Sequence, residues 1–193
     1  METVKVEKKY TYADYCEWDD SERWELIDGL AYAMSPSPSQ THQSVLVELA
    51  GQLRDFLKGN PCRVFVAPLD VRLNAEGADD TVVQPDIFVV CDESKLKDVK
   101  SVIGSPDLII EILSASTASR DLVTKFRLYQ KSGVQEYWIV DPDSKTVTVH
   151  VLHDIGYVSR SYNEYDAAVP VEVLDGCIIN LIDVFEETSS NGD

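Results

Sequence analysis

The chain has 193 residues, of which 44% are hydrophobic and 26% charged, as is usual for one globular domain. Asp and Glu number 34 and Lys and Arg number 17, so the formal net charge is −17. This charge disfavours binding of nucleic acid or anionic membranes by the whole surface, and a nucleic-acid role would need a local basic patch. We expect one domain over residues 1–193, with an ordered core from about residue 10 to about residue 185.

The cysteine spacing and the hydropathy predict a location. No apolar run reaches about 18 residues, and the charged start METVKVEKKY lacks a signal-peptide core, so neither a transmembrane helix nor a leader is expected. The four cysteines, Cys16, Cys62, Cys91 and Cys177, show no metal-ligand spacing. We therefore expect reduced thiols, no structural zinc, no membrane association and a cytoplasmic protein.

The first half of the chain predicts a hairpin, a long helix and several strands. A short helix is expected over 11–18, and the apolar residues that flank Asp28-Gly29 predict a hairpin over 24–34. An apolar stripe predicts a helix over roughly 41–58, which Gly59 ends. Strands are expected at 63–67, 70–73 and 82–91.

The second half alternates between strands and one helix. Strands are predicted at 108–114, 136–140 and 146–152, with weaker candidates at 157–162 and 171–173. A helix is predicted from about residue 119 to 131, ending at Gly133. The sum is an α+β fold in which a mixed sheet carries at least two helices.

Two carboxylates occur within apolar strand patterns. Asp86 lies in VVQPDIFVV, an almost wholly apolar run that predicts a central strand covered on both faces. Glu111 lies in LIIEIL, where both alternating faces are apolar, so it is expected to be at least partly buried. A buried carboxylate needs a hydrogen-bonding partner or a metal.

One lysine of the second predicted helix points toward the sheet. Leu122, Phe126 and Tyr129 form the apolar stripe of this helix, and Lys125 lies at the edge of that stripe. Mg²⁺ prefers one or two carboxylates together with water, and a lysine can stabilise negative charge on an attacked phosphate. Acids on two strands with an inward lysine therefore predict a site that hydrolyses phosphodiesters.

Seven segments, in this order, resemble the Uma-type restriction endonuclease family, which is greatly expanded in cyanobacteria. They are WELIDG (24–29), MSP (34–36) with His42 downstream, PLDVRL (68–73), QPDI (84–87), IEILSAST (110–117), DLVTK (121–125) with Tyr129, and GVQEYWIVDP (133–142). The resemblance spans roughly residues 10 to 185, and the combination is specific although no single segment is decisive.

The resemblance implies the fold and the chemistry of the PD-(D/E)XK nuclease superfamily. That fold is a restriction-endonuclease-like core with a central mixed sheet flanked by helices, here extended by an N-terminal hairpin and C-terminal strands. Carried over, Asp86 and Glu111 would bind Mg²⁺ or Mn²⁺ with the backbone carbonyl of Ile112. Leu113 occupies the position of the superfamily lysine, so the resemblance implies that Lys125 supplies the ammonium instead.

Two further residues would reach the same site by resemblance. Glu25 would approach it from the N-terminal hairpin, and His42 would lie near its rim. The alternatives are that Glu25 is exposed at a strand end and that His42 is an ordinary residue of a first helical turn.

Each of these residues also has a purely structural interpretation. In that case Asp86 and Glu111 would accept hydrogen bonds from backbone N–H groups or arginines, and Lys125 would cover the edge of the core. A basic set on the outer face of the second helix is either solvated or in contact with phosphates; it comprises Arg120, Arg127 and Lys131. His150 and His153 are expected at the surface.

The sequence supports two functional hypotheses. In the first, the protein is a Mg²⁺-dependent endonuclease that acts on DNA, and Asp86, Glu111 and Lys125 form its site. In the second, it is a catalytically inert module with a nuclease fold that binds a protein or nucleic-acid partner, which the net charge of −17 favours. A homodimer is plausible because duplex DNA has two strands.

Overall fold

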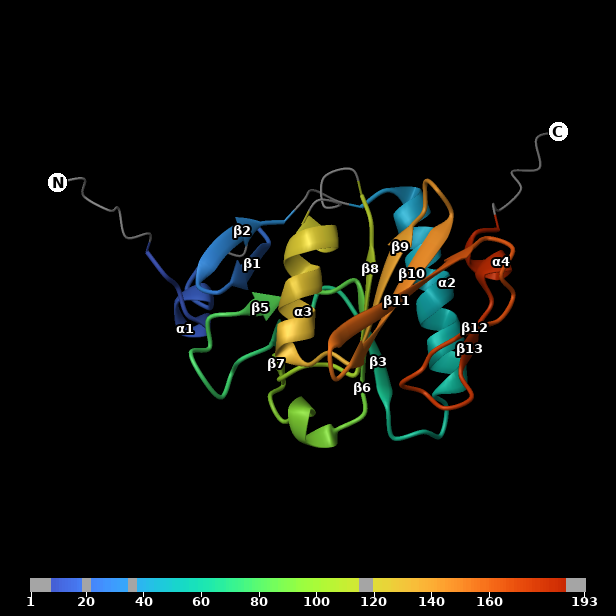
Figure 1. Ribbon diagram of the computed structural model, residues 1–193. Helices are drawn as coiled ribbons and strands as arrows, with labels where there is room; N and C mark the ends of the chain where they lie inside the picture. The colour runs from blue at the N-terminus through green and yellow to red at the C-terminus, as the bar shows by residue number, and fades with distance from the viewer. Residues whose placement is uncertain (1–7, 19–21, 35–37, 115–119, 187–193) are drawn as a thin grey trace.

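The computed structural model describes residues 8–18, 22–34, 38–114 and 120–186, with only the backbone described for 120–122. Two large β-sheets lie next to each other, and helices cover their faces, while a third sheet has only two strands (Figure 1). The larger sheet has the strand order β11-β10-β9-β8-β6-β3, and the smaller one has the order β2-β1-β5-β4-β7. The α+β class and the mixed sheet are therefore confirmed.

The larger sheet contains the strands of the expected core. They are β3 (Arg63–Val66), β6 (Ile87–Val90), β8 (Leu108–Ile112), β9 (Glu136–Asp141), β10 (Thr146–His153) and β11 (Gly156–Asn163). The central pair β8 and β9 is parallel, with Ile110 opposite Trp138, whereas β6 pairs antiparallel with β8. All residues of β6 and β8 are buried, as expected for strands covered on both faces.

The smaller sheet carries the N-terminal hairpin. Its strands are β1 (Trp24–Ile27), β2 (Leu30–Ala33), β4 (Asp70–Arg72), β5 (Val82–Val83) and β7 (Ser101–Ile103). Asp28 and Gly29 form the hairpin turn with φ angles of 48° and 82°, the left-handed conformation that this dipeptide tolerates. The predicted hairpin is confirmed, whereas β7 was not expected.

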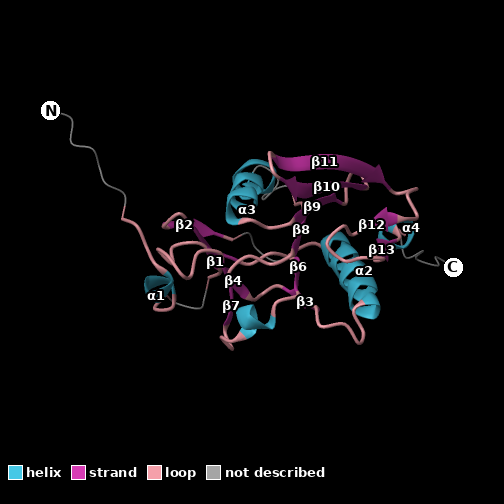
Figure 2. Ribbon diagram, turned by 60° about the horizontal axis from the view of Figure 1, so that its bottom comes forward, coloured by secondary structure: helices cyan, strands magenta, loops and turns pink. Residues whose placement is uncertain are grey.

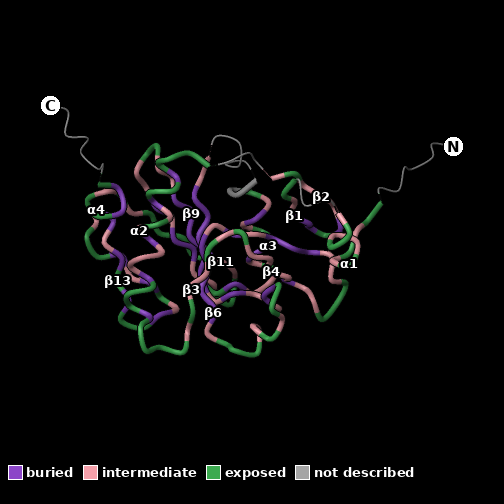
Figure 3. Tube along the Cα trace, turned by 180° about the vertical axis from the view of Figure 1, so that it is seen from behind, coloured by how far each residue is buried: buried purple, intermediate pink, exposed green. Residues whose placement is uncertain are grey.

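Two helices cover opposite faces of the larger sheet (Figure 2). The helix α2 (Gln40–Phe56) buries Val45, Leu49 and Leu53 on one face. A π-helical segment, η2 (Arg120–Lys125), leads into α3 (Phe126–Ser132), which buries Leu128 and Tyr129 on the other face. Buried backbone is concentrated in the central strands between these helices (Figure 3).

Short elements complete the chain. They are α1 (Tyr12–Tyr15), the 3₁₀ helix η1 (Glu93–Leu96), β12 (Val169–Pro170), β13 (Ile178–Ile179) and α4 (Leu181–Val184). The strand expected over 171–173 is wrong, because the backbone turns there between β12 and β13. Among the described residues, no helix has the length and apolar character needed to cross a membrane.

The run expected as one strand over 82–91 is instead two strands in different sheets. The chain leaves the smaller sheet after β5 and enters the larger one at β6, so Gln84, Pro85 and Asp86 link the two. Proline has no N–H to donate to a strand ladder, which explains the break at Pro85. Asp86 consequently lies at the start of β6 and is half-buried, rather than within a fully covered strand.

The cysteine and histidine expectations also require correction. Cys62 and Cys91 form a disulfide, because the pairing of Arg63 with Val90 in β3 and β6 brings the flanking cysteines opposite each other. Cys16 and Cys177 are free thiols. His150 is buried rather than exposed, and burial lowers its pKa to about 4, whereas His153 is exposed as expected.

Candidate active site

Asp86 is held against the peptide that follows Glu111. Its Oδ2 accepts a hydrogen bond of 2.8 Å from the backbone N–H of Ile112. Ile87 at the start of β6 pairs with Ile110 of β8, and Asp86 and Glu111 are the next residues along the two segments. The side chain of Asp86 is 22% exposed, so this carboxylate lies where solvent and a ligand can reach it.

His42 is the second partner of Asp86. It lies in the first turn of α2, where Ser39 caps the helix by accepting the backbone N–H of His42. Its Nε2 is 3.2 Å from Asp86 Oδ2, and its buried Nδ1 has no hydrogen-bond partner in the described part of the chain. The position of His42 beside a strand acid goes beyond that of an ordinary first-turn residue.

Glu111 is almost fully buried, at 4% exposure, and two donors meet at one of its oxygens. Lys125 Nζ lies 2.8 Å from Glu111 Oε1, and the hydroxyl of Tyr129 donates to the same oxygen at 2.7 Å. Burial, followed by the charges of Glu111 and Glu25, raises the pKa of Tyr129 well above its ordinary value. Tyr129 therefore remains a protonated donor at physiological pH.

Lys125 joins the two sheets. Its Nζ is 2.9 Å from Glu25 Oε1 on β1, in addition to its contact with Glu111 on β8. The same Glu25 oxygen accepts the backbone N–H of Gln84 at 3.2 Å. The expectations that Lys125 points inward and that Glu25 is near it agree with this geometry, and Glu25 is buried rather than exposed.

The arrangement has a simple charge balance. Among the described side chains, this group contains three carboxylates, those of Glu25, Asp86 and Glu111, and one ammonium, that of Lys125, with His42 counted as neutral. The formal charge of this group is therefore −2. Within the described ranges, no three Asp, Glu, His or Cys side chains form a metal-binding cluster.

The basic residues of the outer helix face are only partly described. Arg127 and Lys131 are exposed, and Lys131 Nζ lies 3.4 Å from Asp28 Oδ1. The side chain of Arg120 lies outside the described residues. Arg127 and Lys131 therefore lie on a solvent-exposed face of the helix, and their contact with phosphates stays a prediction.

Two contributors to the site were not assigned a role from the sequence. Tyr129 was placed in the apolar stripe and in a segment that resembles the family, but it was given no role in the site, although it lies one turn after Lys125 on the same side of the helix. A tyrosine in a core stripe needs a partner for its hydroxyl, and this is the signal that could have revealed it. Gln84 gave no such signal, because its contact with Glu25 joins residues 59 positions apart.

Comparison with known proteins identifies the family. The Uma2 family model, described as "Putative restriction endonuclease", matches residues 12–181. The chain belongs to this family. Two proteins of Synechocystis sp., both described as uncharacterized, are similar to this chain. One is 30% identical over 152 residues, which cover 77% of each chain. The other is 28% identical over 145 residues, which cover 73% of this chain and 80% of the relative.

A solved structure has the same fold. The crystal structure of "a putative nuclease belonging to DUF820" from Anabaena variabilis superimposes with a TM-score of 0.73. The two sequences are 24% identical, and the match covers 91% of this chain and 97% of the other. The likeness confirms the restriction-endonuclease-like fold, and the family assignment supports a nuclease.

Proposed function

We propose that this Uma2 protein is an endonuclease that hydrolyses DNA phosphodiester bonds with the help of Mg²⁺ or Mn²⁺. The observation that carries the proposal is the convergence of Asp86, Glu111 and Lys125 from three elements at the junction of the two sheets. Family membership and the nuclease fold support the same reaction class.

The donor chemistry fits a hard divalent cation. Carboxylate and carbonyl oxygens are the ligands that Mg²⁺ and Mn²⁺ prefer, and a formal charge of −2 matches one such ion. Both side-chain contacts of Asp86 with the described residues are made by Oδ2, so Oδ1 could bind the metal. Asp86, Glu111 and the carbonyl of Ile112 would hold the ion, which when bound supplies Lewis acidity and a more acidic water.

The surrounding residues position this group and balance its charge. His42 and the Ile112 N–H fix the orientation of Asp86, while Tyr129 and Lys125 fix that of Glu111. The ammonium of Lys125 would offset the negative charge that develops on the phosphate during attack. Glu25 keeps this ammonium at the junction of the sheets.

Plasmid nicking tests the proposal. The purified protein should convert supercoiled DNA to the open circle with Mg²⁺ or Mn²⁺ and lose this activity with a chelator. Asp86→Asn should reduce the rate at least about 100-fold, because it removes a carboxylate that would hold the ion that stabilises the charge of the transition state. Asp107→Asn is the matched control, because Asp107 precedes β8 as Asp86 precedes β6 but accepts the Cys91 N–H outside the site.

Two results would contradict the nuclease assignment. One is a folded wild-type protein that nicks no DNA with either metal. The other is an Asp86→Asn variant as active as Asp107→Asn. We further propose a homodimer, since a duplex presents two strands to be cut, and sedimentation at several protein concentrations would reveal a monomer instead.

An inert binding module is the second candidate function. The observation in its favour is that protein donors already engage Asp86 Oδ2 and Glu111 Oε1 twice each. A net charge of −17 would also weaken long-range attraction to DNA. Saturable Mn²⁺ binding together with plasmid cleavage would exclude this candidate.

A further inference from the structure

A pocket of about 350 Å³ lies on the other side of β1 from Lys125. Trp24 lines it, and because consecutive strand residues alternate between faces, Trp24 and the site residue Glu25 point to opposite sides. The pocket is at the small end of the range for ligand-binding cavities. It is therefore separated from the candidate active site by a single strand.

Aromatic rings form one wall of this pocket. The ring of Trp18 lies 5.4 Å from that of Tyr15 and 5.8 Å from that of Trp24, measured between centroids. All three side chains are only half-buried, so part of their ring surface is open to a ligand. An exposed indole face is a platform on which a planar nucleobase stacks.

A fixed hydrogen-bond acceptor stands beside this wall. Asp70 Oδ1 accepts from the hydroxyl of Tyr15 at 3.1 Å and from Nε2 of Gln84 at 2.8 Å. The guanidinium of Arg23 donates twice to Gln84 Oε1, at 3.0 and 2.7 Å, which fixes the amide orientation. Among the described residues, Asp70 Oδ2 has no partner, so an oriented carboxylate oxygen remains for a ligand.

The pocket and the candidate active site share Gln84. Its side chain orients Asp70 in the pocket, while its backbone N–H donates to Glu25. Asp86 follows two residues later, about 7 Å along an extended chain. A strand of nucleic acid with a phosphodiester near Asp86 would thus have a base within reach of the pocket.

We infer that this pocket binds one unpaired nucleobase bearing an exocyclic amino group, stacked on the tryptophan wall and donating to Asp70. The inference rests on the proposed function, because it assigns a specificity site to the same nuclease. Carboxylates accept hydrogen bonds from the amino group of cytosine, and unstacked bases pair their edges with side chains in this way. Lys100 and Glu22 also line the pocket with opposite charges, so an organic cation is the competing occupant that the titrations below must exclude.

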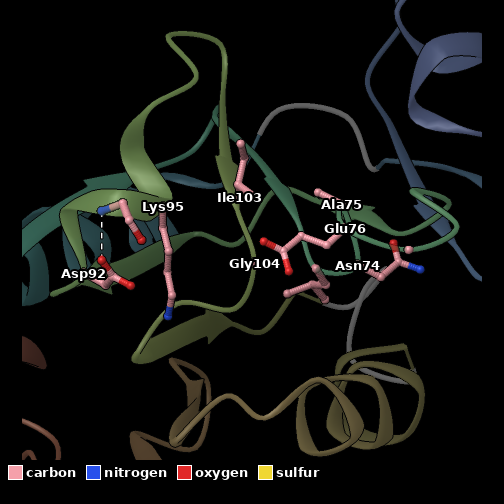
Figure 4. Close-up of a pocket in the computed structure, with 10 residues that line it drawn as sticks. Asn74, Ala75, Glu76, Asp92, Lys95, Ile103 and Gly104 are labelled. Carbon is pink, nitrogen blue, oxygen red and sulfur yellow. Dashed lines mark hydrogen bonds between the residues drawn. The ribbon is translucent and has the colours of Figure 1, made fainter.

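A second hollow, of about 310 Å³, shows the contrast (Figure 4). Three of its polar side chains are engaged within the protein. Lys95 donates to the carbonyl of Ser105, and Asp92 accepts the N–H of Ser94. The side-chain amide of Asn74 donates to Asp80.

The three tryptophans provide a direct test by NMR. Titration with deoxycytidine should shift the indole N–H signals of Trp18 and Trp24 saturably, while that of Trp138 stays unmoved because Trp138 is fully buried and bonded to Glu136. Thymidine, which has no amino group, should bind more weakly. Trp18→Leu should weaken deoxycytidine binding about 5- to 100-fold, the range for loss of one base–aromatic stack.

A conservative variant separates recognition from folding. Asp70→Asn keeps an oxygen for Tyr15 and Gln84 but turns amide donors toward the pocket, so deoxycytidine should lose about tenfold in affinity and thymidine should gain relative to it. Tyr165→Leu, at an exposed ring outside the pocket, is the control and should bind like wild type.

The results also separate this inference from the proposed function. Plasmid cleavage without any shift of Trp18 and Trp24 would overturn the base pocket and leave the nuclease standing. Shifts by deoxycytidine without cleavage would support the pocket while the nuclease fails. Shifts by tetramethylammonium but by none of the deoxynucleosides would show a cation site and overturn the inference.

Discussion

Replacement of Lys125 by methionine should destabilise the protein by about 3–5 kcal/mol. Its ammonium lies 2.8 Å from Glu111 Oε1 and 2.9 Å from Glu25 Oε1, and each of the three side chains is at most 5% exposed. Breaking a buried ion pair by removing one partner leaves an uncompensated buried charge, which carries a penalty of this size. Here the loss leaves two carboxylates without the cation that they share.

Urea unfolding at neutral pH measures this loss. Lys131→Met is the matched control, because Lys131 is exposed and its contact with Asp28 is solvated, so stability should change little. Adding Glu25→Gln to Lys125→Met removes one of the stranded charges and should restore a large part of the stability. A Lys125→Met variant as stable as the control, or a double variant weaker than the single one, would refute the buried network.

Three smaller predictions concern side chains around the two faces of the larger sheet. Tyr129→Phe removes a hydrogen bond to a charged carboxylate and should lower the free energy of unfolding by about 1.5–3 kcal/mol. Tyr157→Phe removes a hydrogen bond to a backbone carbonyl and should lower it by only about 0.5–1.5 kcal/mol. Equal losses in the two variants would contradict this prediction. Burial raises the pKa of Glu136 from 4.5 to about 7, so the folded protein favours its protonated form. The protonated form contributes about 3 kcal/mol to the free energy of unfolding below pH 4.5, and this contribution is lost as the pH rises to about 7. Glu136→Gln should flatten the urea stability profile over that interval, and an unchanged slope would argue against it. Burial lowers the pKa of His150 from 6.5 to about 4, so its neutral form stabilises the folded protein above pH 6.5 and this stability is lost as the pH falls to about 4. His150→Gln should remove this acid sensitivity, and a variant that keeps it would contradict the assignment.

Local patterns selected Glu111 and Lys125, two residues of the candidate site. Glu111 in an apolar strand and Lys125 at the edge of an apolar helix stripe are features of single elements, so periodicity could find them. The contact between Lys125 and Glu25 joins η2 to β1 across 100 positions of the chain, and no local pattern encodes it. The family resemblance, rather than periodicity, placed Glu25 near the site.

The break between β5 and β6 shows where an apolar pattern misleads. Residues 82–90 are nearly all apolar because β5 and β6 are each buried, although in different sheets. Only Pro85 marks the crossing. The Cys62–Cys91 pair was missed for a similar reason, since its proximity depends on the register of β3 and β6. His150 was misplaced because the buried side of β10 packs against Phe126 and Tyr157.

Calorimetric titration with Mn²⁺ tests the central claim most directly, because it asks whether Asp86 and Glu111 share one divalent ion. Wild type and Asp107→Asn should bind Mn²⁺ saturably and alike, while folded Asp86→Asn and Glu111→Gln should each bind at least about tenfold more weakly. Binding of equal strength in all four proteins, or no binding in wild type, would contradict the claim.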